Sequence, residues 1–494
     1  MYKIQLLQQN VVCEAEENDV LFDVICKNIT HFSAPCGGKG ICKKCRVQLL
    51  KGKVSGAVPD ENGYILSCQA RVKSDLIVNV ENLIGSGLSE FIEYKVTSPK
   101  EGIGIILDIG TTTLAACLID LKSGETLKKL STLNPQSIFG ADVLSRIQAS
   151  QEGKLQALQS IILKETQDII TKLADGRKIS ELVLGANTTM LHLFMGIDPK
   201  SIGVYPFVPV FTDTQIVDGK ELGLSVEKVR LLPSAAAYIG GDVTAGVLAC
   251  RLYEGNATKL FVDIGTNGEV VLAHKGKLYA TSTAAGPALE GACIECGVGG
   301  ISGAIDKVEI IDNKLQVHTI DSQPPVGICG SGLIDIIALL LEVGMLDETG
   351  AWEEECDTII KYHKKGDRFY LTDNIYISQK DIRQFQLAKS AISSGIKTLL
   401  AEHKISEEEV DTTYIAGGLG YYMNLKNAVQ TGLFPKGLLS SLKAVGNTCL
   451  SGAHLCLCMD EAQKDIENIA KSIEIVDLSL STIFQEEFMN NIGF

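Results

Sequence analysis

The sequence lacks several patterns that would assign it to a known class of nucleotide-binding or membrane protein. It contains no GxxxxGK[ST] and no complete GxGxxG, so neither a P-loop nor a dinucleotide-binding turn is expected. The first residues, MYKIQLLQQN, are too polar for a signal peptide. The most apolar long run, GLIDIIALLLEVGML, contains two acidic residues and is too short to span a bilayer. We therefore expect a cytoplasmic protein that does not enter a membrane.

Basic side chains are too few for binding to a polyanion. The 494 residues include 45 basic and 60 acidic side chains, which gives a net charge of −15. Such a protein repels phosphate backbones, so no nucleic-acid partner is expected. The length corresponds to roughly three domains, and the 45% of hydrophobic residues is enough for large cores.

Cysteine, by contrast, is abundant, and its spacing near the N-terminus indicates a metal centre. The chain has 15 cysteines, of which Cys36, Cys42 and Cys45 lie in the segment CGGKGICKKC and Cys68 follows in YILSCQARV. Three thiolates from one loop and one from a distant segment can hold a [2Fe–2S] cluster. The glycines of the loop allow backbone N–H groups to point at the sulfurs. A four-cysteine zinc site is the alternative, although such sites usually pair one CxxC with another.

The segments around these cysteines predict the order of a β-grasp ferredoxin. Strands are expected at residues 2–7, 11–16, 44–52 and 75–80, and a helix at 19–29. We assign residues 1–82 to this domain. The predicted strand and helix place Cys13 and Cys26 in its core.

Basic residues surround the cysteine loop without an intervening acidic residue. They are Lys39, Lys43, Lys44, Arg46, Lys51 and Lys53. This face either offsets the negative charge of a thiolate-ligated cluster or docks an acidic redox partner.

A second feature is an Asp-Ile-Gly-Thr turn that occurs twice, 155 residues apart. The segments IGIILDIGTTTLAACLID and TKLFVDIGTNGEVVLAH align at Asp108 and Asp263, each with an apolar strand on both sides of the turn. This internal repeat predicts two related halves. The Gly/Ser-bearing stretch before the first copy, residues 83–102, predicts a linker.

The chemistry of both turns suits a nucleotide with Mg²⁺. Gly110 and Gly265 allow the backbone to approach phosphate oxygens, and the residues after them offer N–H and hydroxyl donors. Asp108 and Asp263, at the ends of buried strands, can hold Mg²⁺ through its waters. The donors are Thr111, Thr112, Thr113, Thr266 and Asn267.

The paired turns resemble the two phosphate motifs of the actin/sugar-kinase/heat-shock ATPase (ASKHA) superfamily. LLPSAAAYIGGDVTAGVLA (231–249) is similar to its first connecting helix, and YIAGGLG (414–420) to its adenosine motif, with Gly417 and Gly418 against the nucleoside. The resemblance implies a mixed α+β and α/β fold class, a β-grasp ferredoxin followed by a two-lobed ATPase. Lobe I is expected at 103–240 and lobe II, with a C-terminal return, at 241–494.

The combination with a ferredoxin resembles the RACo-type reductive activators of corrinoid proteins. Further segments similar to that family are GADVLSRI (140–147), GANTTMLHLFMG (185–196), GPALEGACIECG (286–297), GICGSGLIDII (327–337) and VGNTCLSGA (445–453). The resemblance implies ATP-dependent one-electron reduction of inactive Co(II) to Co(I) on a partner corrinoid protein, through the [2Fe–2S] cluster. An upstream low-potential electron donor is then a second partner.

Within this scheme several roles remain open. Asp242 and Asn187 are candidates for positioning the attacking water, although Asp242 is equally suited to capping a helix at 243–253. Glu269 is ambiguous. Cys293/Cys296 and Cys449/Cys456/Cys458 form either a second metal site or buried thiols. We favour buried thiols, because the CxxC has no evident partner pair and GAHLCLCMD predicts an amphipathic helix. Two other functions remain: an ATP-driven electron donor to another low-potential metalloenzyme, and an ATP-binding redox sensor or scaffold with little turnover.

Overall fold

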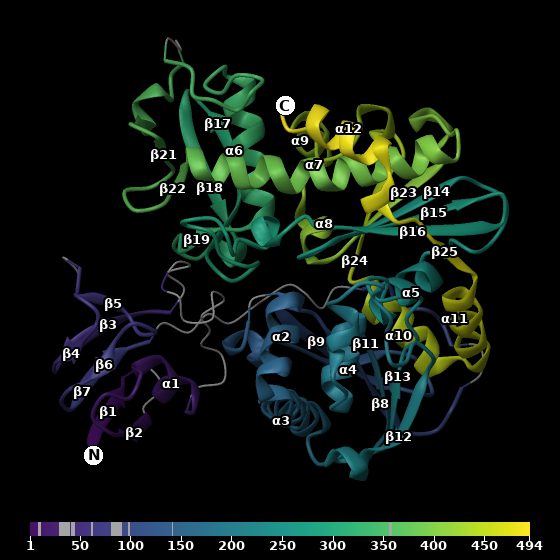
Figure 1. Ribbon diagram of the computed structural model, residues 1–494, viewed down its shortest axis with the longest axis horizontal. Coiled ribbons are helices and arrows are strands. Elements are labelled where there is room, and N and C mark those ends of the chain that lie inside the picture. Colours follow the sequence, from purple (N-terminus) through teal and green to yellow (C-terminus); the bar gives the residue numbers. More distant parts are fainter. Residues whose placement is uncertain are drawn as a thin grey trace.

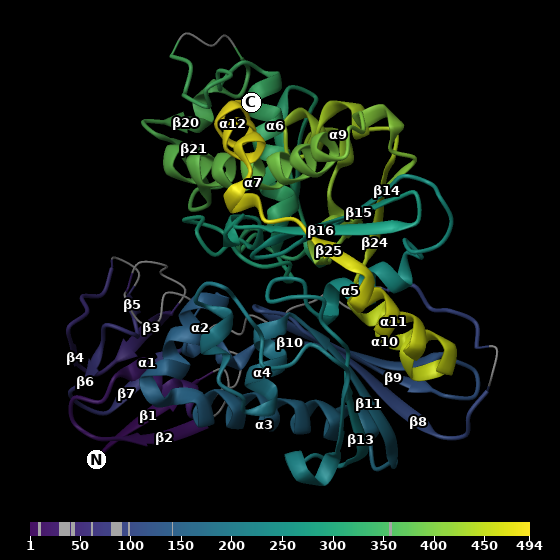
Figure 2. The ribbon, with the colours of Figure 1, turned by 45° about the vertical axis from the view of Figure 1, so that its right-hand side comes forward.

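The computed structural model forms three bodies, which Figures 1 and 2 show in two orientations. It describes residues 1–7, 11–28, 40, 45–60, 63–80, 91–96, 99–140, 142–354 and 358–494. The N-terminal domain lies beside the lower lobe, and a second lobe lies above that one (Figure 1). Within these residues no helix combines the length and the apolar character needed to cross a membrane.

The N-terminal domain is a β-grasp fold, as predicted. Its sheet has the order β2-β1-β7-β3-β5, with β1 and β7 parallel and β1 and β2 antiparallel. Alternate residues of the strands, such as Ile4 and Leu6, enter the core because side chains of a strand alternate between faces. The elements are β1 (Tyr2–Leu6), β2 (Val11–Ala15), α1 (Leu21–Cys26), β3 (Arg46–Lys51), β4 (Val54–Ser55), β5 (Tyr64–Leu66), β6 (Arg71–Val72) and β7 (Leu76–Asn79).

Lobe I contains a six-stranded sheet of order β10-β9-β8-β11-β13-β12. Its central strands are buried on both faces and therefore consist almost entirely of apolar residues. The elements are β8 (Ile103–Ile109), β9 (Thr113–Asp120), β10 (Thr126–Leu133), α2 (Val143–Ala149), α3 (Leu155–Ala174), β11 (Ile179–Ala186), α4 (Thr188–Met195), β12 (Gln215–Asp218) and β13 (Val226–Leu231).

Lobe II is built on a sheet of order β24-β23-β14-β15-β16-β25, with helices above it and two small sheets beside it, on the left of Figure 1. The sheet strands are β14 (Lys259–Ile264), β15 (Gly268–His274), β16 (Lys277–Thr283), β23 (Thr412–Ala416), β24 (Leu442–Gly446) and β25 (Ile473–Ile475). The other elements are β17 (Ala304–Ile311), β18 (Lys314–Thr319), β19 (Gly327–Ile328), α6 (Gly330–Glu342), β20 (Lys364–Lys365), β21 (Arg368–Tyr370), β22 (Tyr376–Ser378), α7 (Gln379–Glu402), α8 (Gly418–Tyr422), α9 (Leu425–Gln430) and α12 (Thr482–Asn490).

The two large sheets repeat one topology, as the duplicated turn predicts. In lobe I, β8 pairs antiparallel with β9 and parallel with β11; in lobe II, β14 pairs antiparallel with β15 and parallel with β23. Asp108 and Asp263 are each the penultimate residue of the equivalent strands β8 and β14. The two Asp-Ile-Gly-Thr turns therefore leave the sheets at corresponding positions.

Three helices join the lobes from one side. These are α5 (Gly241–Ala249), α10 (Thr448–Cys458) and α11 (Asp460–Ser472). Helices α5 and α10 share an apolar core with residues of both large sheets, among them Ile106 of lobe I and Phe261 of lobe II. The sequence predicts an amphipathic helix around GAHLCLCMD, which is wrong, because every residue of α10 is buried.

The segment before lobe I is anchored on these helices. Phe91, Tyr94 and Val96 pack against their apolar core. The Tyr94 hydroxyl donates to the Ala249 carbonyl oxygen at 2.6 Å, and the Ile92 N–H donates to Ser451 Oγ at 3.0 Å. The part of the predicted linker that the structure describes is thus held at the junction of the lobes.

Candidate functional site

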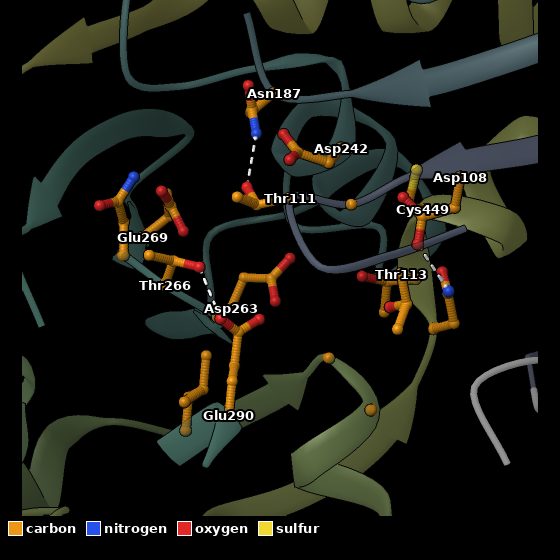
Figure 3. A pocket seen from close by; sticks show the side chains of 18 of the residues that line it. Asp108, Thr111, Thr113, Asn187, Asp242, Asp263, Thr266, Glu269, Glu290 and Cys449 are labelled. Atoms are coloured by element: carbon orange, nitrogen blue, oxygen red, sulfur yellow. Dashed lines mark hydrogen bonds between the residues drawn. The ribbon is translucent and has the colours of Figure 1, made fainter. Parts of the chain in front are cut away.

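A cavity between the lobes gathers the polar residues of both turns (Figure 3). Of the residues predicted from the sequence, it is lined by Asp108, Gly110, Thr111, Thr113, Asn187, Asp242, Asp263, Gly265, Thr266, Asn267, Gly417 and Gly418. The predicted Thr112 lines a neighbouring cavity instead. Residues that are up to 341 positions apart in the sequence, Asp108 and Cys449, thus share one site.

Three aspartates give the cavity a strongly acidic centre. Burial raises the pKa of Asp108 to about 6, of Asp242 to about 7 and of Asp263 to about 8. Mutual repulsion adds to the effect on Asp242 and Asp263, whereas a hydrogen bond from Asn447 Nδ2 to Asp108 Oδ2 at 2.7 Å opposes it. Carboxylates that resist ionisation together are suited to a divalent cation, which supplies the missing positive charge.

Asp242 enters the cavity from the first turn of α5. That helix begins at Gly241 and has Gly240 at its N-cap, so the alternative interpretation of Asp242 as the cap of a helix starting at 243 is wrong. Asp242 Oδ1 instead accepts from the Val243 N–H at 2.8 Å, which leaves its other oxygen for the cavity. A side chain at a helix N-terminus is also a favourable place for negative charge.

Asn187 connects a helix start with the first phosphate turn. Its Oδ1 accepts from the Met190 N–H at 2.9 Å and thereby caps α4, while its Nδ2 donates to Thr111 Oγ1 at 3.2 Å. This arrangement orients the Thr111 hydroxyl. Its geometry therefore gives Asn187 a positioning role, and contact with an attacking water stays a prediction.

Steric contacts explain why two positions in the turns are occupied by glycine. A Cβ on Gly110 would lie 2.8 Å from the Thr113 carbonyl oxygen. Gly417 has φ +88°, and a Cβ there would lie 2.9 Å from the Ile264 carbonyl oxygen and 3.0 Å from Asp263 Oδ1. Both positions therefore require glycine for the turns to close around the cavity.

The cavity is also lined by polar residues that the sequence does not single out, namely Glu290, Asn447 and Thr448, and by Cys449, predicted only as a buried thiol or a metal ligand. All four lie in segments that resemble the family, 286–297 and 445–453. Glu269, ambiguous in the sequence, also lines it, and burial raises its pKa well above the ordinary value.

A second cavity adjoins the first one beyond Gly418. It is lined by Leu289, Val298, Ile320, Leu419 and the N-terminal residues Gly330 and Ser331 of α6. The two cavities share Thr113, Ile264, Glu290 and Gly418. An apolar pocket continuous with a hydroxyl-lined cavity is the kind of space that suits a base and its ribose.

Two of the four predicted cluster ligands fall within the described residues. Cys45 and Cys68 are buried in the core of the ferredoxin domain, and Cys36 and Cys42 lie outside the described residues. Gln69 Nε2 is 3.7 Å from Cys68 Sγ, close enough to donate to the sulfur. The same side chain packs against Gly40, which has φ +73°. A thiol with an N–H donor beside it, next to a left-handed glycine of the loop, fits a cluster-binding cysteine.

Most of the remaining thiols are core residues. Cys456 and Cys458 are fully buried in α10, as expected, and so is His192, whose Nδ1 is 2.7 Å from the Thr188 carbonyl oxygen. Cys449 differs because it lines the acidic cavity and hydrogen-bonds Asp108. Cys293 is exposed on lobe II and Cys296 is half-buried, so the prediction of buried thiols is wrong for this pair.

The architecture and the cavity together define a class of protein: a two-lobed ASKHA ATPase domain joined to a ferredoxin. Residues 4–73 match the model of the 2Fe-2S iron-sulfur cluster binding domain. Residues 103–255 match the RACo middle region, and residues 257–494 match the C-terminal domain of RACo, the ASKHA domain. The predicted fold class is confirmed.

Relatives extend over nearly the whole chain. The corrinoid activation enzyme RamQ of Eubacterium limosum is 33% identical over 443 residues, which cover 84% of this chain and 74% of RamQ. The [Co(II) methylated amine-specific corrinoid protein] reductase of Methanosarcina barkeri is 26% identical, covering 78% of this chain and 75% of the relative. The solved structure of a reductive activator for corrinoid, iron-sulfur protein superposes with a TM-score of 0.74 at 28% identity, covering 100% of this chain and 98% of that one. The chain belongs to the RACo family of reductive activators.

Proposed function

We propose that this protein is an ATP-dependent reductase that returns a corrinoid protein from Co(II) to Co(I). The observation that carries the proposal is the acidic, hydroxyl-lined cavity between two duplicated lobes, in a chain that also contains a ferredoxin domain. Its relatives are named for the same activity. The thiols and the low-potential chemistry point to a reducing compartment, and we propose the cytoplasm.

The residues of the cleft divide the work of binding ATP. We assign Asp108, Asp242 and Asp263 to the hydration shell of Mg²⁺, because all three lie in one cavity and resist ionisation without a cation. The turns at 110–113 and 265–267 bind the phosphates through N–H groups and hydroxyls. The second cavity, next to Gly417 and Gly418, takes the nucleoside.

The ferredoxin domain contributes the redox step. We assign Cys36, Cys42, Cys45 and Cys68 as cluster ligands, and Gln69 as the residue that donates to the Cys68 sulfur. A bound [2Fe–2S] cluster supplies single electrons at low potential. The corrinoid belongs to the partner protein, and a low-potential donor reduces the activator again.

The test combines hydrolysis and spectroscopy under anaerobic conditions. The reduced protein, MgATP and a corrinoid protein held as Co(II) are mixed, and Co(I) is followed by absorption together with phosphate release. Cys68→Ser should abolish Co(I) formation while nucleotide binding persists, and Asp263→Asn should abolish the effect of ATP while the cluster spectrum persists. Binding of ATP without any Co(I) in the presence of several corrinoid proteins would instead favour a sensor or scaffold.

A further inference from the structure

Glu290 lies over both phosphate turns at once. Its Oε2 accepts from Thr266 Oγ1 of lobe II at 2.5 Å and from Thr112 Oγ1 of lobe I at 3.3 Å. Its Oε1 is 3.9 Å from the position of a Cβ on Gly265, the glycine of the second turn. Figure 3 shows the carboxylate directed at Thr266 beside Asp263. One carboxylate oxygen therefore accepts a hydrogen bond from a hydroxyl of each turn.

The Glu290 carboxylate is surrounded by hydrogen-bond donors and a positive charge, as a bound anion would be. It is deeply buried, which raises its pKa, and the hydrogen bonds from the two threonines together with the charge of Arg146 oppose that rise. The Arg146 guanidinium is fully buried behind the first turn and donates from Nε to the Gly140 carbonyl oxygen at 3.1 Å. The charge of Glu290 also adds to the raised pKa of Asp263, since a nearby like charge disfavours ionisation.

We propose that the Glu290 carboxylate occupies the place of a nucleotide phosphate until a nucleotide binds. A phosphate that bridges the two turns needs the same two hydroxyls and brings a like charge. It therefore binds only when the Glu290 carboxylate leaves Thr112 and Thr266. This inference rests on the proposed nucleotide site. It adds that the Glu290 carboxylate and a phosphate compete for the same two hydroxyls.

The backbone around Glu290 allows such a displacement. The residue ends a short 3-10 helix, Pro287–Glu290, between Gly286 at φ +73° and Gly291 at φ +75°. Both flanking residues are glycines in the left-handed region, where other residues are strained. Because Glu290 joins a threonine of each lobe, its departure also removes a direct link between them.

The experiment compares Glu290→Gln with Glu295→Gln as a matched control. Glu295 lies on the same segment and accepts from the Tyr376 hydroxyl at 2.8 Å, outside the cleft. Titration of ATP and of ADP with Mg²⁺ gives the affinities, and steady-state hydrolysis gives kcat and KM. Glu290→Gln should bind ATP about tenfold more tightly, since a neutral amide holds the two hydroxyls less strongly than a carboxylate does. Glu295→Gln should leave the affinity unchanged.

Hydrogen exchange in the wild-type protein supplies a second measurement. ATP should increase exchange at residues 288–291 and decrease it at residues 110–113. Equal or weaker ATP binding by Glu290→Gln, or increased protection of 288–291 with ATP, would overturn the inference. An unchanged affinity with a kcat reduced by orders of magnitude would make Glu290 a catalytic base instead. If the wild-type protein binds no nucleotide, the proposed function itself fails.

Discussion

The carboxyl groups at the centre of the cleft hold protons that exposed aspartates release. Asp108, Asp242 and Asp263 have raised pKa values because the folded protein buries them close together. The folded state therefore binds more protons than the unfolded state between the ordinary pKa of aspartate, about 4, and about 8. Since stability rises with pH only where the unfolded state binds more protons, these groups make it fall over this range.

Asp263→Asn isolates this effect in the empty protein. Without Mg²⁺ and nucleotide, the variant should melt at nearly the wild-type temperature near pH 4 and several degrees above it at pH 8, because the amide cannot ionise. Thermal unfolding followed by circular dichroism across this range measures the difference. A constant difference between the two proteins at every pH would contradict the raised pKa of Asp263. MgATP should stabilise the wild-type protein more than the variant.

The Asn447 side chain links the start of a helix to an aspartate of the cleft, and a single substitution removes both contacts. It caps α10 by accepting from the Leu450 N–H and donates to Asp108. Asn447→Ala should lower the free energy of unfolding by about 1–2 kcal/mol through the lost cap and weaken Mg-nucleotide binding at pH 6, because the pKa of Asp108 rises further. Asn424→Ala, which removes the cap of α9 outside the cleft, is the control. It should reduce stability in urea titrations without changing nucleotide affinity.

For single residues, only a repeated sequence pattern allowed a functional role to be predicted. Asp108 and Asp263 were found because a buried strand ends twice in the same turn. Glu290 and Cys449 carry no such pattern, since a lone glutamate or cysteine in a Gly/Ala-rich segment is usually structural. Their place in the cavity depends on chain segments whose approach only the folded lobes define.

Among the elements of the fold, the turn between β23 and α8 sets the shape of the nucleotide site. Gly417 combines a left-handed φ with two close neighbours, Ile264 and Asp263. Gly255 has a similar φ of +77° but open space around a Cβ. Substitution of Gly255 therefore tests the strain of a left-handed backbone alone, whereas substitution of Gly417 adds a steric clash.

Gly417→Ala should weaken ATP binding at least about tenfold, because a methyl group at 2.9 Å from a carbonyl oxygen forces the turn away from β14. Gly255→Ala should cost about 1–2 kcal/mol of stability and leave ATP binding intact. Isothermal titration of both variants measures this. Equal losses of affinity in the two proteins would refute a specific role for the turn.

Helix boundaries and faces were predicted less well than strands. The segment around His454 and Cys458 has polar residues at intervals that suggest a solvated face, yet α10 is buried all round. Its histidine is buried with a partner, since His454 Nε2 lies 2.8 Å from the Gly124 carbonyl oxygen. Sequence periodicity cannot separate a solvated polar group from a buried one with a partner.

In the molecule as a whole, helices α5 and α10 cross each other and join the two lobes, which the sequence predicts as separate units. A Cβ on Gly452 would lie 2.3 Å from the Ala245 carbonyl oxygen, and one on Gly246 would lie 2.9 Å from Thr448 Oγ1. Small residues thus let the two helices approach closely at their crossing. The sequence predicted α5 as a connecting helix, but nothing in it predicted this crossing partner.

Gly452→Ala should separate the two helices and reduce stability by about 1–3 kcal/mol, the usual cost of overpacking a close contact. ATP hydrolysis should fall with it, since Asp242 and Asn447 stand at the starts of these helices. Gly176→Ala is the control, because a Cβ there meets no neighbour while the φ of +80° strains any other residue. It should lower stability by about 1–2 kcal/mol and leave hydrolysis unchanged. Retention of full ATPase activity in Gly452→Ala would show that the lobes tolerate a wider crossing.

The anchored segment at residues 91–96 gives this crossing a mechanical consequence. Tyr94 is fixed to the last turn of α5 and Ile92 to the first turns of α10, so the chain arriving from the ferredoxin domain is attached to both members of the pair. A rotation of one helix against the other cannot preserve both hydrogen bonds unless residues 91–96 move with it. The segment therefore couples the angle of the helix crossing to the chain that enters lobe I.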